Sequence, residues 1–215
     1  MTDSSCPIGP GGYPSDCDIT HGLLARSRER EAQQAAARGP AWQQAMAKAA
    51  NVKLLLLDVD GVLTDGTIVY THSGTEMKGF STKDGFGIRI LQESGVAVGV
   101  ITARSSEAVR RRAEDLKLAH VYQGIRNKIE VFEEILAKEQ LTPAQVAYMG
   151  DDWLDLPLLI RVGLAVAPAD AVAEVQAAAH YVTSLSGGHG AVREVCHLLI
   201  AAQGKERDLL EKYRR

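Results

Sequence analysis

Two clusters of aspartates have the residue types and spacing to do chemistry together. Asp58 and Asp60 stand two positions apart in DVDGV, directly after the apolar run 53–57, and Gly61 lets the chain curl tightly behind them. Like charges this close are costly unless a cation lies between them or one of them carries a proton. The pair therefore predicts a cation site, with an ordinary acidic turn as the plainer alternative.

The second cluster, GDDWLD, also follows an apolar run. Asp151 and Asp152 come directly after Gly150, and Asp155 lies four residues beyond Asp151, in the next turn. Carboxylate oxygens are hard ligands of the kind that Mg²⁺ takes, usually one or two together with water and phosphate. The alternative is a capped helix start, because Asp152 is a suitable N-cap.

Two segments between these clusters could bind an anion. Thr102 ends the apolar run 96–102, where its hydroxyl could bond a phosphoryl oxygen, and Arg104 could grip an anion through two N–H donors. Lys128 begins a helical pattern, where the helix dipole favours acids, so a bound anion would account for it. Taken singly, these residues have plainer explanations as a strand end before a helix cap and as a surface lysine.

Short apolar runs alternate with helical patterns, and these elements must position the polar side chains. Runs typical of buried strands cover residues 53–57, 96–102, 120–122, 146–150, 164–166 and 181–183. Helical patterns cover residues 84–94, 105–116, 127–139, 153–161, 171–178 and 191–202. This alternation predicts an α/β fold, a Rossmann-like and mostly parallel sheet with helices on both faces, and it places ligands at the carboxyl ends of the strands.

One segment interrupts the alternation. Residues 66–81 place two β-prone runs around His72-Ser73-Gly74, which predicts a projecting β-hairpin beside the first acidic pair. Composition divides the rest of the chain. The expected parts are a disordered segment over 1–20, a helical extension over 21–50, a globular domain over 51–203 that includes the hairpin, and a charged C-terminal tail over 204–215.

The composition argues against several other classes of protein. The chain has 215 residues, of which 46% are hydrophobic and 24% charged, and this suits one globular domain. A net charge of -3 without a polybasic run argues against nucleic-acid and membrane partners. No apolar run approaches the roughly 18 residues that span a bilayer, and the N-terminus lacks the pattern of a signal peptide. Three widely spaced cysteines form no disulfide framework, so we expect a cytoplasmic protein.

Taken together, the motifs resemble those of the haloacid dehalogenase superfamily. DxDGV at Asp58, then Thr102, then Lys128, then GDDxxD at Asp151 occur in the order of its four motifs, and the similarity runs from residue 54 to about 183. Most members cover the site with an inserted cap domain, but here the intervals hold only the hairpin and single helices. The resemblance therefore implies a capless member, whose site another copy of the chain closes or which stays open to a large substrate.

The resemblance also implies roles for these residues. Asp58 would be the nucleophile that forms an aspartyl-phosphate, and Asp60 would protonate the leaving group and then activate water. The Mg²⁺ cofactor would be held by Asp58, the backbone carbonyl of Asp60, and Asp151. The remaining candidates are Thr102 and Lys128, which would neutralise the phosphoryl oxygens, and Asp152 and Asp155, which would be outer or alternative metal ligands.

Longer segments, among them FSTKDGFGIRIL and YMGDDWLDLPLL, closely resemble a capless family whose substrate is 3-deoxy-D-manno-octulosonate 8-phosphate. That resemblance implies a homotetramer that serves lipopolysaccharide precursor synthesis. The implied substrate contacts are Asp60, Ser81, Thr82, Lys83, Asp84, Gly85, Arg89, Arg104, Arg112 and Lys128. The arginines and lysines of this set suit a sugar phosphate that also carries a carboxylate, because the carboxylate needs cations beyond those at the phosphorus. The alternatives are a phosphatase of a nonulosonate 9-phosphate and a non-catalytic regulatory module, which would have little need of Asp60.

The tail motif GGHGAVREVCHLLI matches the same family, in which it reaches toward a neighbouring subunit's site. Three glycines within Gly187–Gly190 predict a flexible hinge before the last long helical pattern. The alternative is an ordinary loop before a helix, and whether the segment acts in a neighbouring site stays open.

Overall fold

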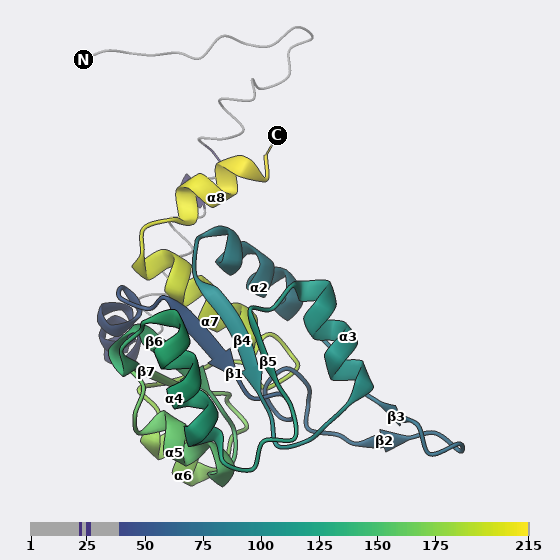
Figure 1. Cartoon of the computed structure of the whole chain (residues 1–215). Coiled ribbons are helices and arrows are strands. Elements are labelled where there is room, and N and C mark those ends of the chain that lie inside the picture. The colour runs from purple at the N-terminus through teal and green to yellow at the C-terminus, as the bar shows by residue number, and fades with distance from the viewer. Residues whose placement is uncertain (1–21, 23–24, 27–38, 215) are drawn as a thin grey trace, which may run out of the picture. The chain divides into compact units, whose positions relative to one another are not determined.

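A computed structural model of the chain describes residues 22, 25–26 and 39–214 (Figure 1). The segment 1–20, expected to be disordered, and much of the extension over 21–50 lie outside the described residues. Residues 39–49 are helical and begin at Gly39-Pro40, a position that proline tolerates because the first turn needs no donor there. The chain divides into two units, Met1–Trp42 and Gln43–Arg215, and the second unit holds every element named below.

Six strands form the sheet of the second unit. They are β1 (Leu54–Leu57), β4 (Ala97–Ile101), β5 (His120–Tyr122), β6 (Val146–Met149), β7 (Leu164–Ala167) and β8 (Tyr181–Val182). Their order in the sheet is β5-β4-β1-β6-β7-β8, and each neighbouring pair is parallel. The predicted strands and the predicted parallel α/β architecture are confirmed.

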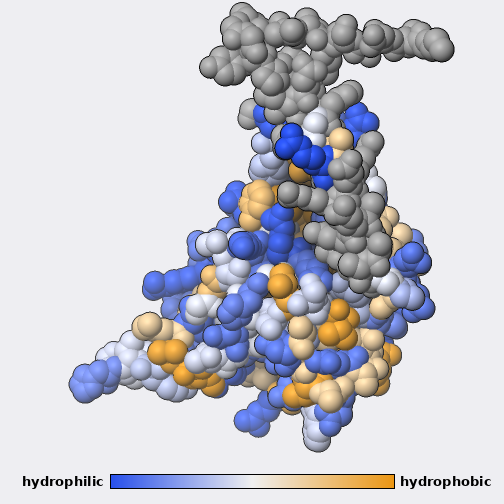
Figure 2. Space-filling view, turned by 180° about the vertical axis from the view of Figure 1, so that it is seen from behind, coloured by the Kyte–Doolittle hydropathy of each residue, from blue (hydrophilic) through white to orange (hydrophobic). Residues whose placement is uncertain are grey.

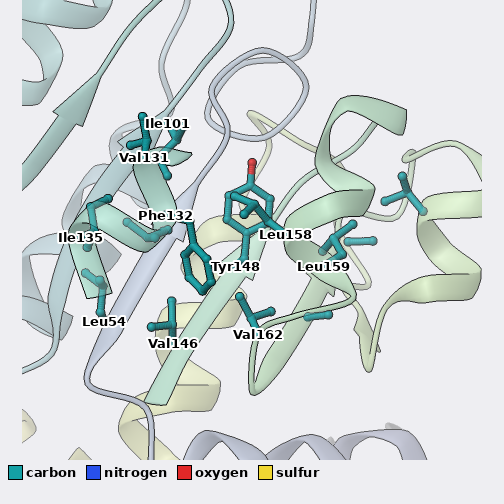
Figure 3. Packing of buried hydrophobic residues seen from close by; sticks show 14 of the residues in the cluster. Leu54, Ile101, Val131, Phe132, Ile135, Val146, Tyr148, Leu158, Leu159 and Val162 are labelled. Carbon is teal, nitrogen blue, oxygen red and sulfur yellow. The ribbon is translucent and has the colours of Figure 1, made fainter. Parts of the chain in front are cut away.

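Strand β1 lies in the middle of the sheet because it is apolar on both faces. All four of its leucines are fully buried. Leu54 and Leu56 pack in a core that includes Phe132 of α4 (Lys128–Glu139) and Leu158 of α5 (Leu156–Leu159). Figure 3 shows Leu54 in this core. Because side chains alternate along a strand, Leu55 and Leu57 face the other side of the sheet. Leu57 pairs with Val100 and Met149, so the residue after it emerges level with the ends of β4 and β6.

Helices cover both faces of the sheet. Besides α4 and α5, they are α2 (Thr82–Glu93), α3 (Glu107–Leu116), α6 (Ala173–Ala178), α7 (Ala191–Ala202) and α8 (Glu206–Lys212), with short 3₁₀ turns η1 (Pro143–Gln145) and η2 (Trp153–Asp155). Helix α7 packs along α2, and α5 contacts α4 and α6 (Figure 1). The charged end of the chain forms its own helix, α8, after a turn at Gly204, which has a φ of +67°. None of the described helices is both long enough and apolar enough to cross a membrane.

The predicted hairpin is confirmed and projects from the domain (Figure 1). Its strands are β2 (Val69–Tyr70) and β3 (Glu76–Met77), which pair antiparallel around a turn in which Gly74 has a φ of +80°. Between β1 and β4 the chain holds only this hairpin and α2, and between β4 and α4 only α3 and β5. Both intervals are described in full, so neither contains a cap domain.

Candidate active site

Lys128 and Asp58 meet in the interior, between the start of α4 and the end of β1. Lys128 Nζ donates hydrogen bonds to Asp58 Oδ1 at 2.7 Å and to Asp155 Oδ1 at 2.6 Å, and the lysine is 4% exposed. Burial acts to lower the pKa of Lys128, but the charges of Asp58 and Asp155 outweigh it and raise this pKa. The lysine is therefore a fixed cation, which rules out the surface-lysine alternative.

The second acidic cluster is organised by Asp155. Its Oδ1 accepts from Lys128 and from the hydroxyl of Tyr148 at 2.6 Å, and its Oδ2 accepts the backbone N–H groups of Asp151 at 2.9 Å and Asp152 at 3.3 Å. Both oxygens thus have protein partners. Asp152 caps the turn η2 by accepting the N–H of Trp153 at 2.6 Å, as the helix-cap alternative predicts.

Three carboxylates lie close enough to share a cation. Asp58, Asp151 and Asp155 each offer an oxygen within 4.8 Å of the others. Burial raises the pKa of Asp58 to about 6. Burial, followed by the charges of Asp58 and Asp155, raises the pKa of Asp151 to about 7. These three carboxylates offer only oxygen ligands, and ionising all of them together is costly. A hard divalent cation fits such a site, because it would offset the repulsion between the carboxylates.

The hairpin contributes Glu76 and Lys78, two charged residues that the sequence reasoning missed. Lys78 contacts Asp60 Oδ1, and Arg104 Nε lies 3.6 Å from Asp60 Oδ2. Glu76 accepts a hydrogen bond from Arg104 Nη2 at 2.6 Å and lies 3.4 Å from Lys78 Nζ. The signal in the sequence is the spacing of Glu76 and Lys78, which places both on one face of a strand. Ion pairs therefore hold this face of the hairpin beside Asp60 of the same chain.

All four motif positions border one open pocket, at the edge where the strands end. It is lined by Asp58, Asp60, Gly66, Thr102, Ala103, Arg104, Lys128, Asp151, Asp152, Leu154 and Asp155. Thr102 is buried, and its Oγ1 accepts the N–H of Arg104 at 3.4 Å. A pocket with two cations and several carboxylates around one buried aspartate can bind a phosphate together with a metal ion.

Most of the other predicted substrate contacts lie outside this pocket. Ser81 is the N-cap of α2, and Arg112 donates to its carbonyl oxygen at 3.1 Å. Arg89 borders a separate hollow with residues of α2 and the end of α3. Thr82 and Lys83 are exposed in the first turn of α2, and Gly85 is buried. Their contact with a substrate stays a prediction.

Asp84, which was also predicted to contact substrate, is 1% exposed. Its carboxylate accepts the backbone N–H groups of Gly190 at 3.2 Å and Arg193 at 2.7 Å, at the start of α7. Its side chain therefore ties the start of α2 to the start of α7.

The prediction of a flexible hinge at Gly187–Gly190 was wrong. A Cβ on Gly187 would lie 1.8 Å from the carbonyl oxygen of Gly61, so glycine is needed for close approach. The N–H of Gly188 donates to the carbonyl of Val62 at 3.0 Å, and the N–H of Gly187 donates to Asp170 at 3.0 Å. The loop is packed against the DxDGV turn of its own chain.

The same turn is packed on its other side. A Cβ on Gly61, which has a φ of +85°, would lie 2.0 Å from Asp151 Oδ2. The two acidic clusters and the glycine loop are thus stacked in layers, with Gly61 in the middle. Helix α7, which follows the loop, is largely buried against α2, so the tail from Gly187 onward is part of the domain rather than a free arm.

Comparison with known proteins places this geometry in a family context. Residues 120–194 match the family of haloacid dehalogenase-like hydrolases. The chain is 48% identical over 167 residues to the 3-deoxy-D-manno-octulosonate 8-phosphate phosphatase KdsC of Escherichia coli (strain B / BL21-DE3), and the match covers 78% of this chain and 89% of that protein.

Solved structures with the same fold include two close neighbours. A probable YrbI family phosphatase from Pseudomonas syringae pv. phaseolica 1448a is 43% identical with a TM-score of 0.79, covering 80% of this chain and 98% of that one. A 3-deoxy-D-manno-octulosonate 8-phosphate phosphatase from Moraxella catarrhalis, in complex with a magnesium ion, a phosphate ion and KDO, is 37% identical with a TM-score of 0.77, covering 79% and 97%.

The layered contact at Gly187 gives a prediction about stability. Gly187→Ala should lower the free energy of unfolding by about 1–3 kcal/mol, because its methyl group overlaps the carbonyl of Gly61 and the backbone must shift. Urea denaturation followed by circular dichroism measures the change. Gly79→Ala is the control, since a Cβ there meets no atom within 4 Å. Equal stability of the two variants would contradict the packing described.

Proposed function

The chain belongs to the haloacid dehalogenase-like hydrolases, and we propose that it is a Mg²⁺-dependent phosphatase that converts 3-deoxy-D-manno-octulosonate 8-phosphate to the free sugar acid and inorganic phosphate. The observation that carries the proposal is the pairing of Lys128 with Asp58 beside Asp151 in one pocket, in a chain 48% identical to KdsC. We assign the reaction to lipopolysaccharide precursor synthesis. We place it in the cytoplasm, a reducing compartment that suits the free thiol of Cys196.

Asp58 is the nucleophile in this proposal. Lys128 holds its Oδ1, which leaves Oδ2 to attack phosphorus as the bond from phosphorus to the sugar oxygen breaks. The product of this step is an aspartyl-phosphate. Thr102 and Lys128 are both on the pocket wall, where the hydroxyl of Thr102 offers a hydrogen-bond donor and the ammonium of Lys128 offers positive charge to the phosphoryl oxygens.

Asp60 moves the protons. It gives a proton to the departing sugar oxygen, then takes one from the water that attacks the aspartyl-phosphate and restores Asp58. Lys78 and Arg104 hold the Asp60 carboxylate from the hairpin side. The residues that would hold Mg²⁺ are Asp58, Asp151 and the backbone carbonyl of Asp60. Bound Mg²⁺ would supply positive charge to the phosphoryl group.

Arg104 is the cation in the pocket best placed for the carboxylate of a sugar acid. Its side chain is 40% exposed, and its guanidinium already pairs with the carboxylate of Glu76. A substrate carboxylate would be a partner of the same charge, and a guanidinium can bind it through two N–H donors. This supports a sugar acid as the substrate class. The length of its carbon skeleton is proposed from the similarity to KdsC.

A second proposal concerns the outer face of the hairpin. Val69 pairs with Met77 across its two strands, and these side chains are 44% and 53% exposed. They alternate with Tyr70, Glu76 and Lys78, which contact one another or Arg104 on the inner face. Figure 2 shows apolar surface at the base of the projecting hairpin. A two-stranded hairpin is marginal alone, so we infer that this face packs on further copies of the chain, as a homotetramer.

A substrate panel tests the activity. With Mg²⁺, kcat/KM for 3-deoxy-D-manno-octulosonate 8-phosphate should exceed that for a nonulosonate 9-phosphate and for hexose phosphates by at least about tenfold. Asp58→Asn should lower kcat at least about a thousandfold, because an amide is a poor nucleophile. Phosphate release measures both. A preference for the nine-carbon acid would reassign the substrate, and no release from any sugar phosphate would favour a regulatory module.

The raised carboxyl pKa values predict how Mg²⁺ binding depends on pH. The pKa is about 6 for Asp58 and about 7 for Asp151, against 3.8 for an ordinary aspartate. Between pH 4 and 7 the unfolded carboxylates ionise first, so the metal-free fold loses stability as pH rises and gains most from Mg²⁺ above pH 7. Titration calorimetry should therefore give a Kd for Mg²⁺ roughly tenfold tighter at pH 8 than at pH 6.

Asp152→Asn is the control for this pH dependence. It removes an exposed capping carboxylate and should keep most of the difference between the two pH values, whereas Asp151→Asn should remove most of it. Equal Mg²⁺ affinity of the unmodified protein at pH 6 and pH 8 would show that protons and the metal do not compete at this site.

The outer face of the hairpin gives a prediction about assembly. Val69→Glu combined with Met77→Glu should convert an assembled protein to single chains, because four or more like charges would meet at the buried contact. Light scattering after size exclusion measures the mass. Thr75→Glu, near the hairpin turn, should leave the mass unchanged. A monomeric unmodified protein would refute self-association.

A further inference from the structure

Tyr148 is a core residue whose hydroxyl group does not belong to the core. It is fully buried in β6, and its ring packs with Leu158 and other apolar residues under α4 and α5. Figure 3 shows its oxygen pointing away from Val146 and Val162, out of the apolar cluster. Packing alone would be satisfied by phenylalanine, so the hydroxyl needs a separate explanation.

The hydroxyl points to the buried charges of the pocket. Its oxygen lies 2.6 Å from Asp155 Oδ1 and 3.0 Å from Lys128 Nζ. A lysine ammonium can only donate, so the hydroxyl accepts from Lys128 and gives its single proton to Asp155. Burial and the charges of Asp155 and Asp58 hold the pKa of Tyr148 well above its usual range, which keeps this proton on the phenol. The direction of both hydrogen bonds is therefore fixed.

The number of donors on Lys128 makes this contact significant. An ammonium has three N–H groups, and Lys128 has three acceptors, namely Asp58 Oδ1 at 2.7 Å, Asp155 Oδ1 at 2.6 Å and the Tyr148 oxygen at 3.0 Å. Three acceptors in different directions fix the orientation of the ammonium as well as its position. With the hydroxyl removed, one N–H group of Lys128 loses its acceptor and Asp155 loses a donor, so the ammonium is held by two contacts in place of three.

We propose that Tyr148 is a positioning residue for phosphoryl transfer, whose hydroxyl holds Lys128 in the orientation that fixes the attacking carboxylate of Asp58. This inference rests on the proposed phosphatase reaction. Tyr148 does not line the pocket and acts through Lys128 and Asp155. Its contribution appears in the transition state, where the direction of the lysine N–H groups matters most.

Tyr148→Phe tests the proposal because it removes one oxygen and keeps the ring packing. We expect kcat to fall roughly tenfold while KM changes less than about twofold. Tyr181→Phe is the matched control. Tyr181 is also buried and also donates to a carboxylate, that of Glu194, but it does so at β8, away from the pocket. The control should lose stability and keep its kcat.

Binding of orthovanadate, which mimics five-coordinate phosphorus, gives a readout that does not depend on turnover. Calorimetry should show vanadate affinity reduced roughly tenfold by Tyr148→Phe and affinity for inorganic phosphate changed less than about twofold. In a Lys128→Met background, adding Tyr148→Phe should cost no further vanadate affinity, because the residue acts through the lysine.

Three results would overturn the proposal: wild-type kcat and vanadate affinity in Tyr148→Phe, an equal loss of kcat in Tyr181→Phe, or additive losses with Lys128→Met. Failure of the unmodified protein to hydrolyse any sugar phosphate would instead count against the proposed function. In that case the vanadate affinities alone would decide whether Tyr148 orients Lys128.

Discussion

Three carboxylates and one ammonium group share a largely buried space where β1 and β6 end. Lys128 offsets one of the charges of Asp58, Asp151 and Asp155, and the low dielectric makes the rest costly. The pKa values of about 6 for Asp58 and about 7 for Asp151 express that cost as retained protons. A divalent cation would bring the group to electrical balance. The site is thus built to be incomplete without a metal.

The rest of the fold keeps these charges together. The leucines of β1 hold the strand between β4 and β6, so the chain can place Asp58 at their common edge. Gly61 then lets the turn behind Asp58 touch Asp151, and Gly187 lets a distant loop close on the same turn. Asp84 and Asp170 anchor that loop at its two ends through backbone N–H groups. Close packing here, rather than flexibility, sets the spacing of the acids.

The sequence predicted the sheet, its helices, the hairpin and the positions of the four motifs. These depend on hydrophobic periodicity and on motif spacing, which are local properties of the sequence. It did not predict what depends on contacts between distant segments. A sequence does not distinguish a glycine that is needed for close packing from a glycine that makes the chain flexible. The glycines of Gly187–Gly190 therefore predict a hinge, although they serve close packing. Tyr148 reads as an apolar strand residue, because only the folded chain brings Lys128 to its hydroxyl. Glu76 and Lys78 read as hairpin surface, because their partners lie in other loops.

Because neither interval of the domain contains a cap, the hairpin is the element that projects beside the site. Its inner face is tied to Asp60 and Arg104 by ion pairs, and its outer face exposes Val69 and Met77. Because the two faces alternate along strands of two residues each, whatever packs on the outer face also fixes the inner one. Another copy of the chain on that face would therefore do more than cover apolar surface. It would hold Lys78 and Glu76 in place beside Asp60, so that assembly would position the group that we propose moves the proton.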